Sequence, residues 1–275
     1  MKAACTLCFH HCLLEEGQTG FCHGRMNVDG KIKCINYGKI TAAALDPIEK
    51  KPFRCFYPGS WIYSLGSFGC NLHCPFCQNS DISTVGLGRV KTYTIMPEDA
   101  VAEALDLKKE GNIGIAYTYN EPLISYEYLM DTTPLAHENG LKNVLVTNGT
   151  IEEAPLRNLL PYIDAMNIDL KGFTENFYKL LGGDLETVKR TIQISSEKCH
   201  VEVTTLVIPN GNDSDDEIRQ IATFLANIDP DIPYHLSRFF PRWKMTDRSA
   251  TNVNSVYHLA DVAREKLKNV FTGNC

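Results

Sequence analysis

The sequence has no long apolar run, no apolar leader and no excess of positive charge. Its longest apolar runs, such as Val144 to Val146 and Leu206 to Ile208, are far too short to cross a bilayer. The N-terminus lacks the apolar core of a signal peptide, so we expect a cytoplasmic protein. The formal net charge of −6 over 275 residues argues against a surface for nucleic acid. We therefore expect neither a membrane nor a nucleic acid as partner.

Glycine-rich loops that hold nucleotide phosphates are also missing. No Gly-x-Gly-x-x-Gly and no Walker-type motif occurs, which argues against a dinucleotide or ATP fold. Short apolar runs nevertheless alternate with amphipathic segments from Trp61 onward. We expect buried strands over residues 62–65, 113–117, 143–146, 165–170, 201–208 and 234–239. Apolar strands that alternate with helices indicate a parallel sheet covered by helices. Six such units favour an α/β fold, a full or partial (β/α) barrel of mainly parallel strands.

Apolar stripes with helical spacing predict the helices between these strands. We expect helices over residues 97–109, 126–139, 185–192, 218–225 and 256–267. Ser214 and Glu217 form a predicted capping box in front of one of them. Pro134 is expected to kink or split the helix over residues 126–139, because proline lacks the N–H that a helix interior needs.

Residues 1–58 have few periodic segments and many cysteines. So short a segment cannot bury much of a core alone. We interpret it as a small Cys-rich, metal-stapled N-terminal module followed by a connector. Residues 46–52 are expected to be that extended connector, and the barrel is expected over residues 59–275.

Against these absences, eleven cysteines are the prominent feature of the composition. In a reducing compartment they need a reason other than disulfides. The first of two clusters consists of Cys5, Cys8, Cys12 and Cys22. Four soft ligands within 18 residues suit a tetrahedral zinc ion or an auxiliary iron–sulfur cluster. We favour structural zinc because so small a module needs a staple, and the auxiliary cluster is the other interpretation.

The second cluster consists of Cys70, Cys74 and Cys77, directly after the first predicted barrel strand. Loops that follow barrel strands lie on the face where active sites form. Three thiolates with this spacing can each hold one iron of a 4Fe–4S cubane and leave the fourth iron open. Catalysis needs such an open metal position. The alternative is a zinc site completed by His73 or by a distant cysteine.

The segment Gly69 to Asn79, Gly-Cys-Asn-Leu-His-Cys-Pro-Phe-Cys-Gln-Asn, resembles the cluster loop of radical S-adenosylmethionine enzymes. The resemblance is to the subgroup of glycyl-radical-enzyme activases such as pyruvate formate-lyase activating enzyme. Tyr119-Asn120-Glu121-Pro122, Thr147-Asn148-Gly149 and Asp169-Leu170-Lys171 match further motifs of that subgroup in the same order. With the N-terminal cysteine pattern and residues 46–52, the sequence is most similar to the radical enzyme of the AmmeMemoRadiSam system.

The resemblance implies that a 4Fe–4S cluster on the second cysteine group reductively cleaves S-adenosylmethionine. The product is a 5′-deoxyadenosyl radical that abstracts hydrogen from a protein or small-molecule substrate. An electron donor such as flavodoxin or ferredoxin is implied as partner. A more specific form of the hypothesis is that the protein activates a glycyl radical enzyme. The implied cofactor-binding residues are Phe76, Tyr119, Asn120, Glu121, Asn148, Asp169, Lys171 and His235. No catalytic residue is assigned beyond these and the cluster ligands.

The charged residues of this set have expected roles. Glu121 is suited to accept hydrogen bonds from the amine of S-adenosylmethionine, and Lys171 to pair with its carboxylate. Asp169 and His235 are expected to hold the ribose or to orient the lysine.

Two departures from the activases limit the resemblance. Val146 stands where pyruvate formate-lyase activases carry an aspartate that helps a bound cation, and the ferredoxin-like insertion after the cluster loop is missing. The valine puts in doubt both a cation site and a simple transfer of the activase substrate to this protein. Cys275 stands where relatives continue into another cysteine-bearing tail, and it is either a remnant ligand or without a role.

Two other classes of function compete. A zinc-stapled, non-catalytic binding or regulatory protein would not need Glu121, Lys171 or an open cluster site. A metallohydrolase on a barrel has no support, because no His-x-His or similar set follows a strand.

Overall fold

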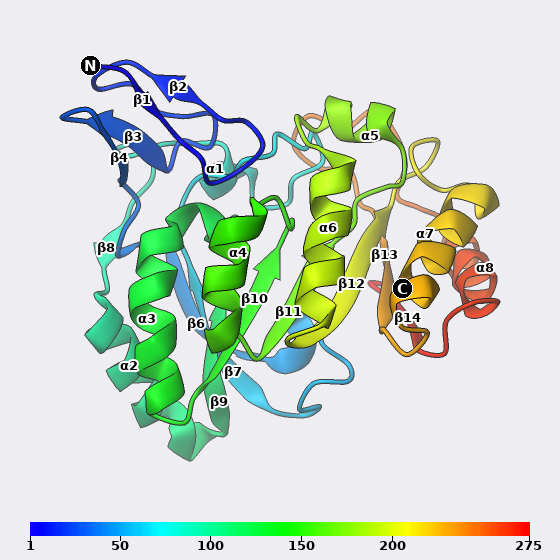
Figure 1. Ribbon diagram of the computed structural model, residues 1–275. Coiled ribbons are helices and arrows are strands. Elements are labelled where there is room, and N and C mark those ends of the chain that lie inside the picture. The colour runs from blue at the N-terminus through cyan, green and yellow to red at the C-terminus, as the bar shows by residue number, and fades with distance from the viewer.

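The computed structural model describes residues 1–275 and is built around one eight-stranded sheet (Figure 1). The strand order is β14-β13-β12-β11-β10-β9-β7-β6, and every neighbouring pair is parallel except β6 with β7. β6 and β14 are the two edges and do not pair with each other. The predicted α/β fold is confirmed, and the barrel is a partial one.

The strands of the main sheet are β6 (Ala42–Pro47), β7 (Trp61–Gly66), β9 (Asn112–Tyr117), β10 (Lys142–Thr147), β11 (Ala165–Asp169), β12 (His200–Val207), β13 (Tyr234–Arg238) and β14 (Val270–Gly273). All six predicted strands are confirmed to within one residue at each end. β6 and β14 were not predicted. β6 is rich in alanine, which is a weak strand former, and β14 is only four residues long.

The helices are α1 (Ser80–Ser83), α2 (Pro97–Asp106), α3 (Tyr126–Glu138), α4 (Glu153–Leu159), α5 (Glu175–Leu180), α6 (Leu185–Ser196), α7 (Asp215–Ile228) and α8 (Val253–Arg264). Helices α2, α3, α4, α6, α7 and α8 lie along the outside of the sheet (Figure 1). Their apolar stripes pack with buried side chains from successive strands, among them Ile115, Leu145, Ile168, Val203 and Leu236. None of the helices is long and apolar enough to cross a membrane.

Two local predictions are corrected by the structure. Pro134 lies inside α3 and does not split it, while a kink at Pro134 stays a prediction. The buried face of this helix, which includes Leu129 and Ala136, outweighs the hydrogen bond that proline removes. The capping box of α7 is only half formed: Ser214 Oγ accepts from the Glu217 amide at 3.2 Å, but the Glu217 carboxylate accepts from the Phe173 amide at 2.6 Å.

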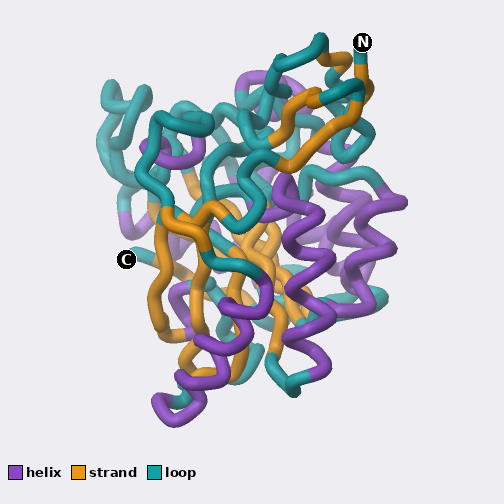
Figure 2. Tube along the Cα trace, turned by 90° about the vertical axis from the view of Figure 1, so that its left-hand side faces the viewer, coloured by secondary structure: helices purple, strands orange, loops and turns teal.

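Residues 1–34 form two small hairpins above the carboxyl ends of the barrel strands, where many loops also gather (Figures 1 and 2). Strand β1 (Ala3–Ala4) pairs with β2 (Leu13–Leu14), and β3 (Arg25–Val28) pairs with β4 (Lys31–Cys34). A further short pair joins β5 (Lys39–Ile40) to β8 (Tyr93–Thr94). The buried Arg25 guanidinium binds both carboxylate oxygens of Glu127 at 2.6 Å and so fixes the hairpins to α3.

The predicted connector over residues 46–52 has regular structure instead. Its first residues complete β6, and Ile48–Lys50 form a 3₁₀ turn. The apolar side chain of Ile48 is fully buried together with Phe53 and Ile62, and this burial fixes the segment. β6, which precedes residue 58, is therefore hydrogen bonded to β7, which follows it. The division of the chain into two domains at residue 58 stays a prediction.

Gly114 in β9 lies directly against the β10 backbone, where an added Cβ would overlap the carbonyl oxygen of Lys142. We expect Gly114→Ala to lower the free energy of unfolding by about 3 kcal/mol, because the two strands would have to separate. Gly88→Ala is the control: its left-handed backbone costs about 1 kcal/mol, but no atom lies within 4 Å of the added carbon. Urea unfolding under anaerobic conditions measures both. Equal losses for the two variants would contradict the prediction.

Candidate functional site

A cavity of about 650 Å³ opens inside the partial barrel at the carboxyl ends of the strands. Every predicted ligand of the barrel cluster and of S-adenosylmethionine lines it, namely Cys70, Cys74, Phe76, Cys77, Tyr119, Asn120, Glu121, Asn148, Asp169, Lys171 and His235. All of them except His235 come from the carboxyl ends of β7, β9, β10 and β11 or from the loops that follow these strands. In a parallel sheet such loops meet at one end, which is why residues so distant in sequence share a wall. His235 is the second residue of β13 and lines the cavity from within the sheet.

The loop that carries the three cysteines is held by side-chain amides from the neighbouring strand ends. Asn120 donates to the carbonyl oxygens of Phe68 at 3.2 Å and Gly69 at 3.0 Å, and accepts from the Ser67 amide at 2.8 Å. Asn71, inside the loop, donates to the Thr150 carbonyl oxygen at 2.8 Å. The loop is therefore ordered by the protein itself.

The chemistry of the three thiols fits a cubane, in which each thiolate would bind its own iron. Cys70 Sγ also accepts hydrogen bonds from the Leu72 amide at 3.3 Å and from Asn148 Nδ2 at 3.5 Å. These donors suit a sulfur that carries negative charge.

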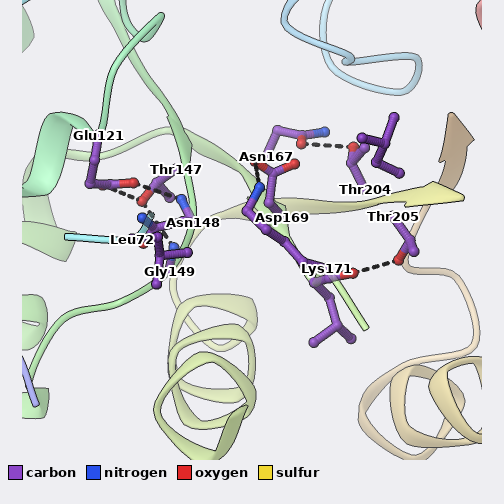
Figure 3. A network of polar contacts seen from close by, with 12 residues as sticks. Leu72, Glu121, Thr147, Asn148, Gly149, Asn167, Asp169, Lys171, Thr204 and Thr205 are labelled. Carbon is purple, nitrogen blue, oxygen red and sulfur yellow. Dashed lines mark hydrogen bonds and ion pairs between the residues drawn. The ribbon is translucent and has the colours of Figure 1, made fainter. Parts of the chain in front are cut away.

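Glu121 is buried beside this loop and has three hydrogen-bond donors (Figure 3). Its carboxylate accepts from Thr147 Oγ1 at 2.6 Å, from the Asn148 amide at 2.8 Å and from the Leu123 amide at 3.0 Å. Burial raises the pKa of Glu121 to about 7, although the three donors act in the opposite direction. A cationic group placed in the cavity would favour the ionised form.

Lys171 and Asp169 form an ion pair on the adjoining wall, with Nζ 2.9 Å from the carboxylate (Figure 3). Burial alone would lower the pKa of Lys171, but the Asp169 charge raises it above its usual value. Lys171 is therefore a cation. Its backbone is fixed as well, because its carbonyl oxygen accepts from Asn212 Nδ2 at 2.6 Å.

Glu202 is a functional candidate that the sequence analysis missed. This carboxylate on β12 is fully buried and lies 2.5 Å from His235 Nε2 and 2.9 Å from His200 Nε2. It also accepts from the backbone amides of Arg54 and Cys55. Burial would raise the pKa of Glu202, but these four donors lower it to about 2. The carboxylate therefore stays charged and fixes the ring of His235 at the cavity wall.

Asp46 and Lys51, which we predicted to be part of an extended connector, stabilise the wall of the same cavity. Lys51 Nζ lies 2.8 Å from the Asp46 carboxylate and 4.4 Å from the ring centre of Tyr119. The Tyr119 hydroxyl donates to Asp46 at 2.6 Å. Burial would raise the pKa of Asp46, but the hydrogen bonds from Lys51 and Tyr119 hold it well below its usual range. A charged network thus fixes Tyr119, whose backbone φ is +69°.

The N-terminal cysteines lie outside this cavity. Cys5, Cys8, Cys12 and Cys22 line a separate, much smaller cavity together with His10 and His11. None of the eleven cysteines forms a disulfide.

The family of this protein follows from comparison with known proteins. The Radical SAM superfamily model matches residues 65–225, which is more than half of the chain. The chain therefore belongs to the Radical SAM superfamily. Its cofactors are a 4Fe–4S cluster and S-adenosylmethionine, and the protein is an enzyme of this superfamily.

Relatives and solved structures agree with this assignment. Uncharacterized protein MJ0808 of Methanocaldococcus jannaschii is 40% identical over 276 residues, which cover 99% of this chain and 81% of that protein. Pyruvate formate-lyase-activating enzyme of Clostridium pasteurianum is 25% identical over 166 residues, 58% of this chain and 67% of that protein. QueE from Escherichia coli shares the fold, with a TM-score of 0.53 at 14% identity over 84% of this chain and 92% of that chain.

The low pKa of Glu202 predicts how stability depends on pH. A carboxyl group with a folded pKa near 2 and an ordinary value of 4.5 contributes about 3 kcal/mol above pH 4.5, and loses it as the pH falls toward 2. We expect Glu202→Gln in the metal-free protein to lower the free energy of unfolding by that amount at pH 7. The difference from wild type should shrink between pH 4.5 and 2.

Urea unfolding at several pH values measures this difference. The exposed Glu175→Gln is the control, since a surface ion pair with Lys179 contributes little. A deficit for Glu202→Gln that is constant down to pH 2 would show that the carboxylate charge is not its cause.

Proposed function

We propose that this enzyme binds a 4Fe–4S cluster through Cys70, Cys74 and Cys77 and cleaves S-adenosylmethionine reductively at the open iron. The single observation that carries the proposal is the convergence of three cysteines and eight predicted cofactor-binding residues on one cavity. When bound, the cluster supplies the electron that breaks a sulfur–carbon bond of S-adenosylmethionine and yields a 5′-deoxyadenosyl radical. That radical would abstract hydrogen from the substrate.

The residues of this chain bind and orient the cofactor. Glu121 faces the cavity with a carboxylate already fixed by Thr147 and by the Asn148 amide, and it accepts from the amine of S-adenosylmethionine. Lys171, a buried cation, binds the carboxylate of S-adenosylmethionine while Asp169 holds it in place. Because these side chains are held before the cofactor enters, little ordering remains to be done on binding.

The wall that carries His235 would receive the adenosine end of the cofactor. His235 lines the cavity, is held by Glu202 through Nε2, and would bind a ribose hydroxyl. Phe76 and Tyr119 add apolar surface around the cofactor. The charged segment of Asp46 and Lys51 keeps Tyr119 in position. A cavity walled in this way limits the access of water to a reactive radical.

Among the chemistries of this superfamily we favour the activase-like subgroup, and within it the radical enzyme of the AmmeMemoRadiSam system, whose motifs the sequence resembles. The match to pyruvate formate-lyase-activating enzyme supports this choice. The substrate is then a protein, such as a glycyl radical enzyme, or a small molecule. Reduction would come from flavodoxin or ferredoxin in the cytoplasm, a compartment that keeps thiols reduced.

Removal of one cluster ligand tests the reaction directly. We expect the anaerobically reconstituted, dithionite-reduced protein to form 5′-deoxyadenosine from S-adenosylmethionine. Cys74→Ala should form none above background, because three protein ligands are required to hold the cubane. Chromatographic quantification of 5′-deoxyadenosine measures both. Two colourless, zinc-loaded proteins without product would instead favour the non-catalytic alternative.

The proposed role of Glu121 makes a second, separable prediction. We expect Glu121→Gln to keep the cluster, seen as unchanged brown absorbance, but to bind S-adenosylmethionine at least tenfold more weakly. An amide offers the cofactor amine a neutral acceptor in place of a charged one. Equilibrium binding to the reconstituted protein measures the affinity. Glu98→Gln, an exposed change in α2, is the control and should bind like wild type. An unchanged affinity of Glu121→Gln for S-adenosylmethionine would show that the Glu121 carboxylate does not bind the cofactor.

A further inference from the structure

One charged segment of the cavity wall has no ligand in the proposed function. Five residues of the connection between β6 and β7 line the cavity, namely Glu49, Lys50, Lys51, Pro52 and Arg54. This segment, residues 49–54, runs below the sheet at the amino ends of the strands, in light blue in Figure 1. Most of the predicted cofactor-binding residues lie at the carboxyl ends instead. The two groups of residues therefore line opposite ends of one cavity.

Buried side chains anchor this segment in the barrel. Ile48 and Phe53 are fully buried. They belong to one apolar cluster with residues of β9, β10 and β11, namely Ala116, Val144 and Ala165. Two large apolar side chains thus fill the interior of the partial barrel at this end, so that a ligand reaches only as far as the charged residues of the segment.

Side chains of two inner strands fix the backbone of the segment. Asn167 Nδ2 in β11 donates to the Pro52 carbonyl oxygen at 2.9 Å. The Arg54 amide donates to the Glu202 carboxylate in β12 at 3.0 Å. The charged side chains of the segment are therefore carried by a backbone that is already held in place before a ligand binds.

Positive charge exceeds negative charge around this segment. Lys51 Nζ lies 2.8 Å from the Asp46 carboxylate, and Lys50 Nζ lies 3.2 Å from it, so one carboxylate serves two cations. Glu49, the acidic residue of the segment, already accepts a hydrogen bond from the Gly59 amide at 2.7 Å. Because the whole chain carries a net charge of −6, the local excess of positive charge is not a general property of its surface.

Arg54 is the cation of this segment that has no acidic partner. Its guanidinium makes no ion pair and no hydrogen bond, and the residue is exposed where it lines the cavity. Lys171, the cation at the other end, is already paired with Asp169. A guanidinium presents a planar fork of N–H donors that matches a carboxylate or a phosphate. Arg54 is therefore a free anion-binding group at the end of the cavity away from the cluster loop.

We propose that the cavity takes a small-molecule substrate with an anionic group, a carboxylate or a phosphate, which binds Arg54 and Lys50. The inference rests on the proposed function, since it names the class of substrate on which that chemistry acts. The anion lies at the amino end of the cavity, and S-adenosylmethionine lies at the carboxyl end beside the cluster loop. The uncharged part of the substrate extends from Arg54 toward the cofactor.

The size of the cavity favours a small molecule over a polypeptide. Pockets for small ligands measure about 300–1,000 Å³. This cavity of about 650 Å³ is shared with S-adenosylmethionine, and the buried Ile48 and Phe53 fill the barrel interior at its amino end. The remaining space suits a molecule of few atoms better than a loop of a protein.

Binding of simple anions tests this end of the cavity. The probes are glycerol 3-phosphate, succinate, a tetraglutamate peptide and neutral glycerol, each added to the anaerobically reconstituted protein with S-adenosylmethionine bound. We expect glycerol 3-phosphate or succinate to bind with a Kd of about 1 mM or lower in isothermal titration calorimetry, and glycerol not to bind. Whichever of the two small anions binds more tightly identifies the anionic group of the substrate.

Substitution of Arg54 shows whether this residue binds the anion. Arg54→Gln should weaken the binding at least tenfold, because it removes charge-assisted hydrogen bonds. Arg54→Lys should lose less affinity, since it keeps the positive charge without the planar fork. Arg157→Gln, in an exposed ion pair with Glu153 on α4, is the matched control and should bind like wild type.

Several outcomes would overturn the inference. They are no binding of either small anion, equal affinity in Arg54→Gln and wild type, and tighter binding of tetraglutamate than of either small anion. A parallel loss of affinity for S-adenosylmethionine in Arg54→Gln also overturns it, because Arg54 would then serve the cofactor.

Formation of 5′-deoxyadenosine, measured on the same samples, separates this inference from the proposed function. A wild type that binds an anion at Arg54 but forms no 5′-deoxyadenosine contradicts the proposed function and leaves the anion site standing. A wild type that forms 5′-deoxyadenosine but binds neither small anion contradicts this inference alone.

Discussion

The common direction of seven strands is the constraint on which the site depends. In the main sheet β7 and the strands from β9 to β14 all run in the same direction, so every loop that follows one of them reaches the same end of the barrel. Cys70, Glu121, Asn148 and Lys171 are far apart in sequence, yet they line one cavity for this reason. β6 and β14 do not pair with each other, so the barrel stays open between these two edges.

The inner face of the barrel is unusually polar for a protein core. Asn167, Glu202, Thr204 and His235 are all buried there, while the alternate residues of the same strands pack against the helices. Charged groups are costly in such a place unless they are paired and hydrogen bonded. Glu202 meets that condition with four donors, and Glu121 with three. The carboxylates are thus held in fixed positions before any ligand is bound.

Much of this arrangement was predictable from the sequence, because strand ends and cysteine spacing are local signals. The six apolar strands were predicted from their short apolar runs, whereas Glu121, Asn148 and Lys171 were predicted from the resemblance to family motifs. Glu202, Asp46 and Lys51 were missed because their importance arises only through partners distant in the chain, such as His235 for Glu202 and Tyr119 for Asp46. β6 was missed for the same reason, since its weak alanine-rich sequence is a strand only because β7 pairs with it.

The N-terminal module makes contacts that its cysteine motif alone does not predict. Considered as a sequence, four cysteines in a short segment need only a structural staple, and zinc is sufficient for that. In the structure Cys22 is hydrogen bonded to Cys70, and Phe21 stacks on His73 within the barrel loop. These contacts fix the N-terminal module against the loop that carries Cys70, Cys74 and Cys77. The glycine at position 69, which the close approach requires, argues that this contact is built into the fold rather than incidental to it.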